Sequence, residues 1–400
     1  MLRVLTLATL FPSTAQPTLG GFVERQTIGL AARDDVELQV VSPVGLPPWP
    51  LSLHPHYRAR GRLPLREIRK DLIIHRPRFL SLPARGAAMA PRAMARALLP
   101  LLREIRKDFP FDIIDAEFFW PDGPTAMHLA AALAIPFSIK ARGADIHYWP
   151  TRAGIGGQIL AAGKAADGLL AVSEALKADM MRLGMPGTIA VHYTGVDPDL
   201  FKPIDRAEAK AALGVQGPLI VTAGALIPRK GQSLALSALA EIPDATLLFV
   251  GDGPDRRLLE ERAKRSGVDR RVRFLGNRPH ETLPGLFGAA DIMLLPSRSE
   301  GLANVWVESL ACGTPIVIPD IGGAREVVDR PEAGRLTPAD PAAMAIAVRE
   351  ILADPPAQEA VRRSAERFSW ERNSEALFEH LSGLAHQRSS PETLSVQTFE

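Results

Sequence analysis

Short apolar runs alternate along the chain with longer segments in which apolar residues recur at helical spacing. An uninterrupted apolar run of strand length indicates a strand buried on both faces, and a spacing of three to four residues indicates a helix packed on one side. Alternation of the two predicts a parallel sheet covered by helices, and so an α/β protein. The predicted strands are residues 4–10, 36–43, 111–118, 135–141, 168–172, 188–193, 219–223, 245–250, 272–275 and 291–296.

The alternation breaks around residues 195–217 and restarts at Pro218. Four hundred residues also exceed what one hydrophobic core usually organises. We therefore predict two doubly wound domains that face each other across a cleft, where ligands would bind at the carboxyl ends of the strands. The predicted parts are residues 1–195, a linker 196–217, a second domain 218–369, a closing helix 370–386 able to return to the first domain, and a disordered tail 387–400.

Composition and net charge are ordinary for a soluble protein, since 46% of residues are hydrophobic, 23% are charged and the net charge is +2. Basic residues nevertheless outnumber acidic ones between Arg58 and Lys107, with Leu, Phe and Met among them. This stretch is either a solvated face or a peripheral contact with an anionic membrane, and both readings stay open. No nucleic-acid module accompanies the charge, so nucleic acid is not predicted as a partner.

No apolar run approaches the roughly 18 residues of a membrane span. The first residues could mimic a signal peptide, but the run is strand-length and leads to Gly20-Gly21, which favours a buried strand. The expected location is the cytoplasm, with the inner face of the cell membrane as the place of any peripheral contact. Cys312 is the only cysteine, which excludes an intrachain disulfide and favours an inert packed thiol.

Residues 291–328 place an apolar strand, a loop and a helix start in succession. A helix start exposes unpaired N–H groups and the positive end of a dipole, so the predicted start near Leu302 would stabilise a phosphate. Glu300 precedes this helix and Glu308 lies inside it, among apolar residues where an unpaired charge would be costly. Carboxylates beside a phosphate site suggest sugar hydroxyls.

Arg229 and Lys230 lie between the strand 219–223 and a predicted helix, which places positive charge at the carboxyl end of the sheet. Such charge would stabilise an anionic group placed against it. The alternative is an exposed basic turn. Gly20 and Gly21 lack side chains, so the backbone of the first domain could approach a ligand closely.

Glu300 and Glu308 are separated by seven residues, ahead of an Ala-Cys-Gly-Thr-Pro sequence that ends the helix. With this pattern and several glycine motifs in the same order, the chain resembles the retaining glycosyltransferases of family 4, which have the two-domain GT-B fold. The resemblance covers nearly everything except the basic stretch and the tail. The other motifs are Gly20-Gly21, Gly195-Val196-Asp197 with Phe201, Gly224 to Gly231, Gly251 to Pro254, Phe274 to Gly276 and Gly322-Gly323.

The resemblance implies sugar transfer from a nucleotide-diphosphate sugar to a glycan or lipid-linked acceptor, in polysaccharide or glycolipid synthesis, with no metal or other cofactor. Lys230, assisted by Arg229, would bind the diphosphate, Glu300 would contact the donor sugar, and Glu308 would bind the ribose. Further donor-binding positions are Gly224, Gly253, Gly301, Leu302, Ala303 and Asn304. The acceptor or phosphate loop would comprise Gly20, Gly21, Arg142 and Asp145.

Two positions depart from the family pattern. The usual His-Gly-x-Asp is Arg142-Gly143-Ala144-Asp145 here, and Ala225 replaces the arginine of Gly-Arg-Leu. Arg142 cannot act as a general base, although it could bind phosphate or an acidic sugar. These two departures leave a catalytically impaired binding protein as an alternative. A nucleotide-sugar epimerase, which can share this architecture, is a second alternative.

Two further motifs indicate other chemistry only weakly. Asp197-Pro198-Asp199 resembles a metal-binding carboxylate pair, but we interpret it as a turn entering a short helix, with Pro198 at the first helical position. Gly251-x-Gly253 lacks the third glycine of a dinucleotide fingerprint, since Arg256 stands there, so an oxidoreductase is not favoured.

Overall fold

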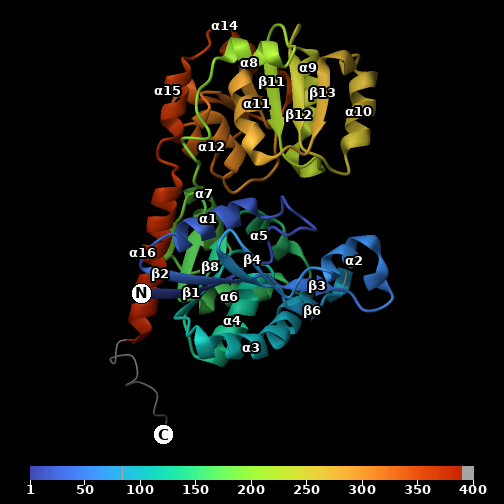
Figure 1. Ribbon diagram of the computed structural model, residues 1–400. Helices are drawn as coiled ribbons and strands as arrows, with labels where there is room; N and C mark the ends of the chain where they lie inside the picture. The colour runs from blue at the N-terminus through green and yellow to red at the C-terminus, as the bar shows by residue number, and fades with distance from the viewer. Residues whose placement is uncertain (83, 390–400) are drawn as a thin grey trace. The chain divides into compact units, whose positions relative to one another are not determined.

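The computed structural model describes residues 1–82 and 84–389. Within these residues the chain forms two compact units, each built on its own large sheet (Figure 1). Unit 1 comprises Met1–Tyr193 and the C-terminal helix α16 (Trp370–Ser389), and unit 2 comprises Thr194–Ser369. The predicted α/β class is therefore confirmed in both halves of the chain.

The large sheet of unit 1 has eight strands among the described residues, in the order β10-β9-β8-β7-β1-β2-β5-β4. All neighbours are parallel except the hairpin of β4 and β5. The central strands are buried along their whole length, which their continuous apolar runs predict. The strands are β1 (Leu2–Leu7), β2 (Val36–Val41), β4 (Arg66–Arg69), β5 (Leu72–His75), β7 (Ile113–Ala116), β8 (Phe137–Ala141), β9 (Gly168–Ala171) and β10 (Ile189–Val191), while β3 (Val44–Leu46) and β6 (Arg78–Leu80) form a separate pair.

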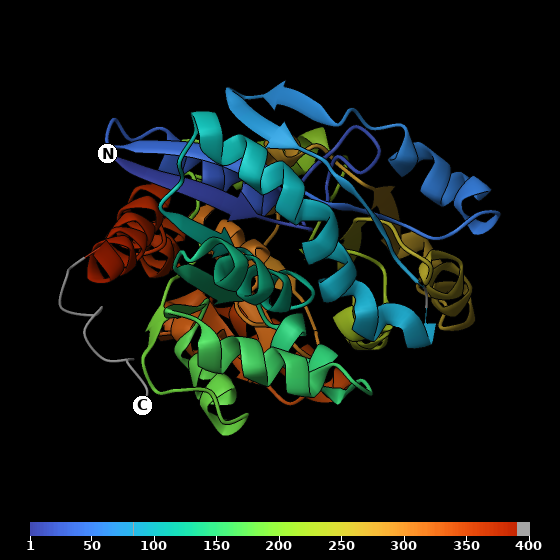
Figure 2. The same cartoon turned by 90° about the horizontal axis from the view of Figure 1, so that it is seen from below.

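Helices cover both faces of this sheet. Helices α1 and α16 pack together on one face, and α3, α4 and α6 lie side by side on the other (Figure 2). The helices are α1 (Gly21–Ala31), α2 (Pro55–Gly61), α3 (Ala90–Asp108), α4 (Asp122–Leu133), α5 (Ala144–His147), α6 (Gly156–Ala165) and α7 (Glu174–Arg182), with short 3-10 turns η1 (Leu51–Leu53), η2 (Ala84–Met89) and η3 (Trp149–Thr151).

Polar contacts join helix α16 to the strands of unit 1. His380 Nε2 lies 2.8 Å from Ser138 Oγ on β8, and His192 Nε2 lies 2.7 Å from the carbonyl oxygen of Asn373. Burial lowers the pKa of His380 to about 4. The return of the closing helix to the N-terminal domain is thus confirmed. The helix continues to Ser389 rather than ending at 386, and residues 390–400 of the predicted tail lie outside the described residues.

Unit 2 contains a parallel sheet that has six strands in the described chain, ordered β13-β12-β11-β14-β15-β16. Helices α9, α10 and α14 bury an apolar core against one face, and α8, α11, α12 and α15 contact one another on the other. The strands are β11 (Leu219–Ala223), β12 (Thr246–Val250), β13 (Val272–Gly276), β14 (Ile292–Leu294), β15 (Ile316–Pro319) and β16 (Gly334–Thr337). The helices are α8 (Arg206–Ala212), α9 (Gln232–Ala240), α10 (Arg256–Arg265), α11 (Leu283–Ala289), α12 (Asn304–Ala311), α13 (Ala324–Val327), α14 (Pro341–Ala353) and α15 (Gln358–Arg362), with 3-10 turns η4 (Pro228–Lys230), η5 (Asp269–Arg271), η6 (His280–Thr282), η7 (Pro331–Ala333) and η8 (Arg363–Ala365).

The structure also contains elements that the pattern did not predict. Strands β15 and β16 are only four residues long, and the basic stretch forms strands β4, β5 and β6 besides helices. The Asp197-Pro198-Asp199 segment is a turn, and the short helix expected at Pro198 does not form there. Asp197 Oδ1 accepts the N–H groups of Asp199 and Leu200 in this turn. Residues 196–217, predicted as a linker, belong to unit 2.

Candidate functional site

The first candidate site lies in unit 2, where β11 and β14 are parallel neighbours and their carboxyl ends meet. Gly231 closes the loop after β11 with a φ of +69°, and a Cβ there would lie 1.9 Å from the carbonyl oxygen of Pro296. Only glycine allows this approach. The N–H of Arg298 then donates to the carbonyl oxygen of Arg229 over 2.8 Å. The two loops are consequently held together.

This contact brings together the three residues predicted to act on the donor. Lys230 Nζ lies 2.6 Å from Glu300 Oε1, and an Arg229 guanidinium nitrogen lies 3.2 Å from Glu300 Oε2. Arg229 also donates to the carbonyl oxygen of Ser299 over 2.6 Å. The side chains of Lys230 and Glu300 are 13% and 10% exposed, whereas Arg229 is 39% exposed. The cluster is therefore nearly buried, with Arg229 at its open side.

The charges in this cluster keep Glu300 ionised. Burial alone would raise the pKa of its carboxyl, but Lys230 and Arg229 outweigh burial and hold the pKa below its ordinary value. A carboxylate with two cations beside it can accept hydrogen bonds from hydroxyl groups at neutral pH. Lys230 and Arg229 can each also form an ion pair with an anion placed beside them.

The loop after Glu300 leads to the amino end of α12. Gly301, Leu302 and Ala303 remain outside the helix, which begins at Asn304, two residues after the predicted start at Leu302. Ala303 is the N-cap residue and supplies no side-chain cap, while Gly323 donates its N–H to the carbonyl oxygen of Gly301 over 2.7 Å. The first N–H groups of α12 therefore have no side-chain acceptor at the cap.

Glu308 lies one turn into α12 and is almost fully buried, as the sequence indicated. Its Oε1 lies 2.9 Å from Nε2 of His280, whose ring also contacts the ring of Phe201 with a centroid separation of 4.9 Å. The sequence analysis did not identify His280. The signal available was the buried carboxylate itself, which requires a partner.

Gly224 and Gly253 occupy the loops that follow β11 and β12. The N–H of Gly224 donates to the carbonyl oxygen of Val250, and Leu226 donates to that of Asp252. These bonds join the two loops side by side at the carboxyl edge of the sheet. Their predicted donor contacts stay predictions.

In unit 1, Gly20 and Gly21 form the amino end of α1. Gly20 is the N-cap with a φ of +73°, and a Cβ there would lie 2.2 Å from the carbonyl oxygen of Leu10. Gly20 thus fixes the turn between β1 and α1. A Cβ at Gly21 would meet nothing within 4 Å, so the space beside the first turn is open.

Arg142 is held within unit 1 by several contacts. Its Nε donates to the carbonyl oxygen of Glu117 over 2.8 Å, its NH2 group pairs with the Glu117 carboxylate, and its guanidinium lies 4.8 Å from the centre of the Phe22 ring. Only 10% of the side chain is exposed. An acceptor anion would therefore meet an arginine that is already paired.

Asp145 uses its carboxylate to fix its own loop. It accepts N–H groups from Gly143 at 2.8 Å, Arg142 at 3.0 Å and Phe119 at 3.1 Å. Burial raises its pKa despite these bonds. Arg142 and Asp145 are therefore adjacent, as predicted, and their role toward an acceptor stays a prediction.

Glu117 and Lys140, which the sequence analysis did not identify, complete this group. Both are buried, and Lys140 Nζ contacts Gln26 Oε1 and His192 Nδ1. Burial lowers the pKa of Lys140 well below its usual range. Burial would raise the pKa of Glu117, but Arg142 and Lys140 keep it below its ordinary value.

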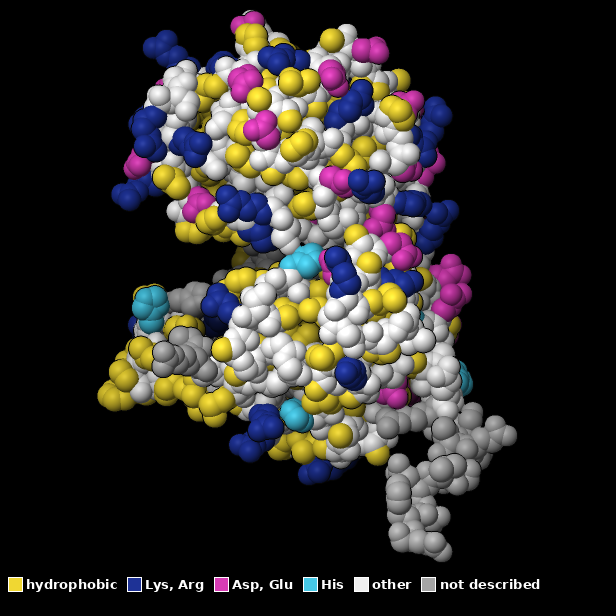
Figure 3. Space-filling model, turned by 180° about the vertical axis from the view of Figure 1, so that it is seen from behind, with side chains coloured by type: hydrophobic (Ala, Val, Ile, Leu, Met, Phe, Trp, Pro, Cys, Tyr) yellow, Lys and Arg dark blue, Asp and Glu magenta, His cyan; other side chains and the backbone are white. Residues whose placement is uncertain are grey.

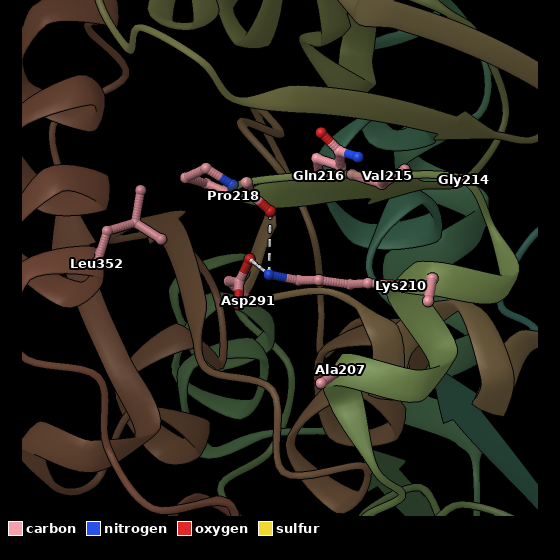
Figure 4. A pocket seen from close by; sticks show the side chains of 10 residues that line it. Ala207, Lys210, Gly214, Val215, Gln216, Pro218, Asp291 and Leu352 are labelled. Carbon is pink, nitrogen blue, oxygen red and sulfur yellow. Dashed lines mark hydrogen bonds and ion pairs between the residues drawn. The ribbon is translucent and has the colours of Figure 1, made fainter.

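Other features of unit 2 do not form a reactive site. Burial raises the pKa of the Cys312 thiol to about 12, in agreement with a packed thiol. Among the described residues no group of three or more His, Cys, Asp or Glu could hold a metal ion. A pocket of about 850 Å³ lies at the amino end of β11, opposite the Lys230 cluster, where Lys210 Nζ pairs with Asp291 Oδ2 at 2.5 Å (Figure 4).

Known structures share this arrangement along nearly the whole chain. A sucrose-phosphate synthase (tll1590) from Thermosynechococcus elongatus matches with a TM-score of 0.73 and 21% identity, covering 97% of this chain and 98% of that one. Anabaena Alr3699/HepE in complex with UDP matches with a TM-score of 0.72 and 20% identity, covering 96% and 100%. The two Rossmann-like units thus define a GT-B glycosyltransferase fold.

Sequence comparison gives the family. The model for glycosyl transferases group 1 matches residues 204–368, and the model for Glycosyltransferase Family 4 matches residues 29–200. This chain belongs to the family 4, or group 1, glycosyltransferases. Bacillus subtilis TuaC, named as a teichuronic acid biosynthesis glycosyltransferase, is 27% identical over 87% of this chain and 88% of its own length. D-inositol 3-phosphate glycosyltransferase of Mycobacterium tuberculosis is 35% identical over 48% of this chain and 43% of its own length.

One further finding concerns the membrane. No helix in the described part of the chain is both long and apolar enough to cross a bilayer.

Proposed function

We propose that this protein transfers a sugar from a nucleotide-diphosphate sugar to a hydroxyl group of a glycan or lipid-linked acceptor, in polysaccharide or glycolipid synthesis, with retention of the anomeric configuration. The reaction breaks the bond between the anomeric carbon and the diphosphate, forms a bond to the acceptor oxygen, and releases a nucleoside diphosphate and a proton. The Lys230–Glu300–Arg229 cluster beside the start of α12 carries this proposal.

The cluster suits a leaving diphosphate because charge grows on that group during the reaction. Lys230 and Arg229, with the N–H groups at the start of α12, supply fixed positive charge at one edge of the sheet. Glu300 would accept hydrogen bonds from the donor sugar. Glu308, oriented by His280, would do so from the ribose hydroxyls.

We propose that the transfer requires no divalent metal, since Lys230 and Arg229 offer the charge that a metal would otherwise supply. Asp197 already uses its carboxylate on backbone N–H groups of its own turn. Activity should therefore survive chelation by EDTA. Loss of turnover with EDTA, restored by Mn²⁺, would overturn this part of the proposal.

The test combines donor, acceptor and stereochemistry. Incubation with a panel of nucleotide sugars and extracted glycan or lipid acceptors should release nucleoside diphosphate, and NMR of the product should show the same anomeric configuration as the donor. An inverted product would contradict retention. Donor binding without transfer to any acceptor would favour a binding protein, and an isomerised donor without acceptor would identify an epimerase.

We further propose that the protein acts on the cytoplasmic side of the cell membrane, where nucleotide sugars would be available to it. Fractionation of cells that produce the full chain should recover it with the cytoplasm or with the inner membrane after low-salt lysis. Recovery from the medium or periplasm would contradict this placement.

A further inference from the structure

The structure shows which cations of the basic stretch of unit 1 are exposed and which are already paired. Several of its cations are used inside the unit: Arg69 and Lys70 pair with Glu24, and Arg76 pairs with Glu67. Among the described residues of this stretch, Arg58 on α2, Arg62 directly after α2, and Arg92 and Arg96 on α3 are exposed and form no ion pair, and the same holds for Arg66 on β4 and Arg103 later in α3. Arg58, Arg62, Arg92 and Arg96 belong to the segments that also carry the exposed apolar residues, so these four are the relevant charges.

Large apolar side chains are exposed close to these arginines. Trp49 is 78% exposed, Leu51 is 53% exposed and Leu53 is 60% exposed, all immediately before α2. Leu80 on β6 and Met89 at the start of α3 are 53% and 62% exposed. Exposed apolar groups gathered in one region mark an interaction surface more often than chance.

The elements that carry these residues touch one another. Strand β6 pairs with β3, α2 packs on η1 and β3, and α3 contacts both β6 and η2. In Figure 3 the end of unit 1 that carries α2 projects at the lower left, with hydrophobic side chains along its rim and Lys or Arg side chains beside them. We call this surface the apolar-basic rim: Trp49, Leu51, Leu53, Leu80, Met89, Arg58, Arg62, Arg92 and Arg96.

Acidic residues are missing from both segments that build the rim. The sequence has no Asp or Glu between Leu38 and Arg66, and none between Leu72 and Arg103. A symmetric dimer through this rim would place the same positive patch against itself, which is unfavourable. Anionic lipid headgroups are complementary to the arginines, and tryptophan and leucine side chains insert at the lipid interface.

We propose that the apolar-basic rim docks on a bilayer that carries anionic lipids, with Trp49, Leu51 and Leu53 inserted at the interface. This extends the proposed function, because it would bring a lipid-linked acceptor to the enzyme. Docking requires no nucleotide sugar, so a failure of docking and a failure of glycosyl transfer are separately observable.

The experiment uses the full chain and vesicles of phosphatidylcholine with or without phosphatidylglycerol. Sedimentation should show binding to the anionic vesicles alone, at least tenfold weaker when salt rises from roughly 0.05 M to roughly 0.5 M. All five tryptophans lie in the described chain, and Trp49 is the exposed one while the others are buried or half-buried. Tryptophan fluorescence should therefore shift to the blue on binding.

Two double variants test the two parts of the rim. Trp49→Ser with Leu53→Ser, and Arg58→Glu with Arg62→Glu, should each reduce the bound fraction at least tenfold while leaving the thermal midpoint unchanged. The matched control is Leu258→Ser with Ile346→Ser, two residues of unit 2 that are 53% and 50% exposed, and it should bind like the wild type.

Several results would overturn the proposal. These are equal binding to neutral vesicles, absence of binding to anionic vesicles, and undiminished binding by either rim variant. Self-association in sedimentation velocity without lipid, abolished by Trp49→Ser with Leu53→Ser, would instead assign the rim to a second copy of the chain.

Discussion

The two units each place a lysine, an arginine and a glutamate around the carboxyl ends of parallel strands, yet the two clusters differ in exposure. In unit 2, Arg229 is accessible and shares Glu300 with Lys230. In unit 1, Arg142 and Glu117 pair in the interior, close to the buried Lys140. The exposed Arg229 distinguishes the cluster of unit 2, and we expect that this exposure, rather than residue type, allows it to receive a ligand while the cluster of unit 1 stabilises its own unit.

The largest effect on stability is expected when the carboxylate is removed from the buried Arg142–Glu117 cluster of unit 1. Glu117→Ala should lower the free energy of unfolding by about 3–5 kcal/mol, because Arg142 and Lys140 would lose the negative charge that compensates their burial. Urea denaturation followed by circular dichroism measures this. The matched variant Glu300→Ala should lose turnover with a much smaller stability change, and an equal loss of stability would contradict the comparison.

A substitution in the Lys230–Glu300–Arg229 cluster of unit 2 should instead reduce turnover with little change in stability. Lys230→Ala should reduce kcat roughly 100- to 1,000-fold, because the charge that stabilises the leaving diphosphate is lost. Release of nucleoside diphosphate measures the rate, and the thermal midpoint should stay close to that of the wild type. Lys210→Ala, at the other end of the same sheet and paired with Asp291, is the control and should retain turnover.

We expect acid to lower the free energy of unfolding of unit 1 through His380. Burial lowers the pKa of this histidine to about 4 from an ordinary value near 6.5. The unfolded chain takes up a proton below pH 6.5 while the folded chain resists until about pH 4, so this contribution to stability is present above pH 6.5 and is lost as pH falls to 4. The lost stability is about 3 kcal/mol.

Asp122 acts in the opposite direction over part of this range, because burial raises its pKa to about 7. The measurement is therefore the difference in unfolding free energy between the wild type and His380→Gln, followed from pH 7 to pH 4. The wild type should lose stability relative to the variant as pH falls. A constant difference would show that His380 does not titrate with this shift.

The smallest effect is expected at His280, which orients Glu308. His280→Ala should raise KM for the donor about tenfold with little change in kcat, because a hydrogen bond to a charged group is lost. His280→Gln keeps a donor N–H and should restore most of the affinity. A change in kcat alone, or no rescue by Gln, would argue against a positioning role.

Much of the fold could be predicted because buried parallel strands are continuous apolar runs, as in β7, β8 and β11. Strand β15 escaped prediction because Gly313, Pro315 and Pro319 surround its short apolar run and are typical of loops, and β16 because Leu336 is its one large apolar residue. The hairpin of β4 and β5 lies in the basic stretch, where charged residues obscure the apolar alternation.

The sequence predicted which residues form the candidate site better than it predicted which of them contact one another. Lys230 and Glu300 are 70 positions apart, so their pairing depends on the neighbouring placement of β11 and β14 and on Gly231. Glu117 was missed because it follows an apolar strand without a motif, and His280 because a single histidine in a loop carries no pattern. Glu117 and His280 can be recognised only once the fold shows their partners, Arg142 for Glu117 and Glu308 for His280.

The central claim is that the open cluster of unit 2, rather than the buried cluster of unit 1, receives the nucleoside diphosphate. Isothermal titration of UDP, GDP and ADP into the wild type, Lys230→Ala and Lys210→Ala tests it most directly. The account predicts binding of at least one nucleotide to the wild type and Lys210→Ala, with at least tenfold weaker binding to Lys230→Ala. Equal affinity of all three proteins for that nucleotide would contradict it.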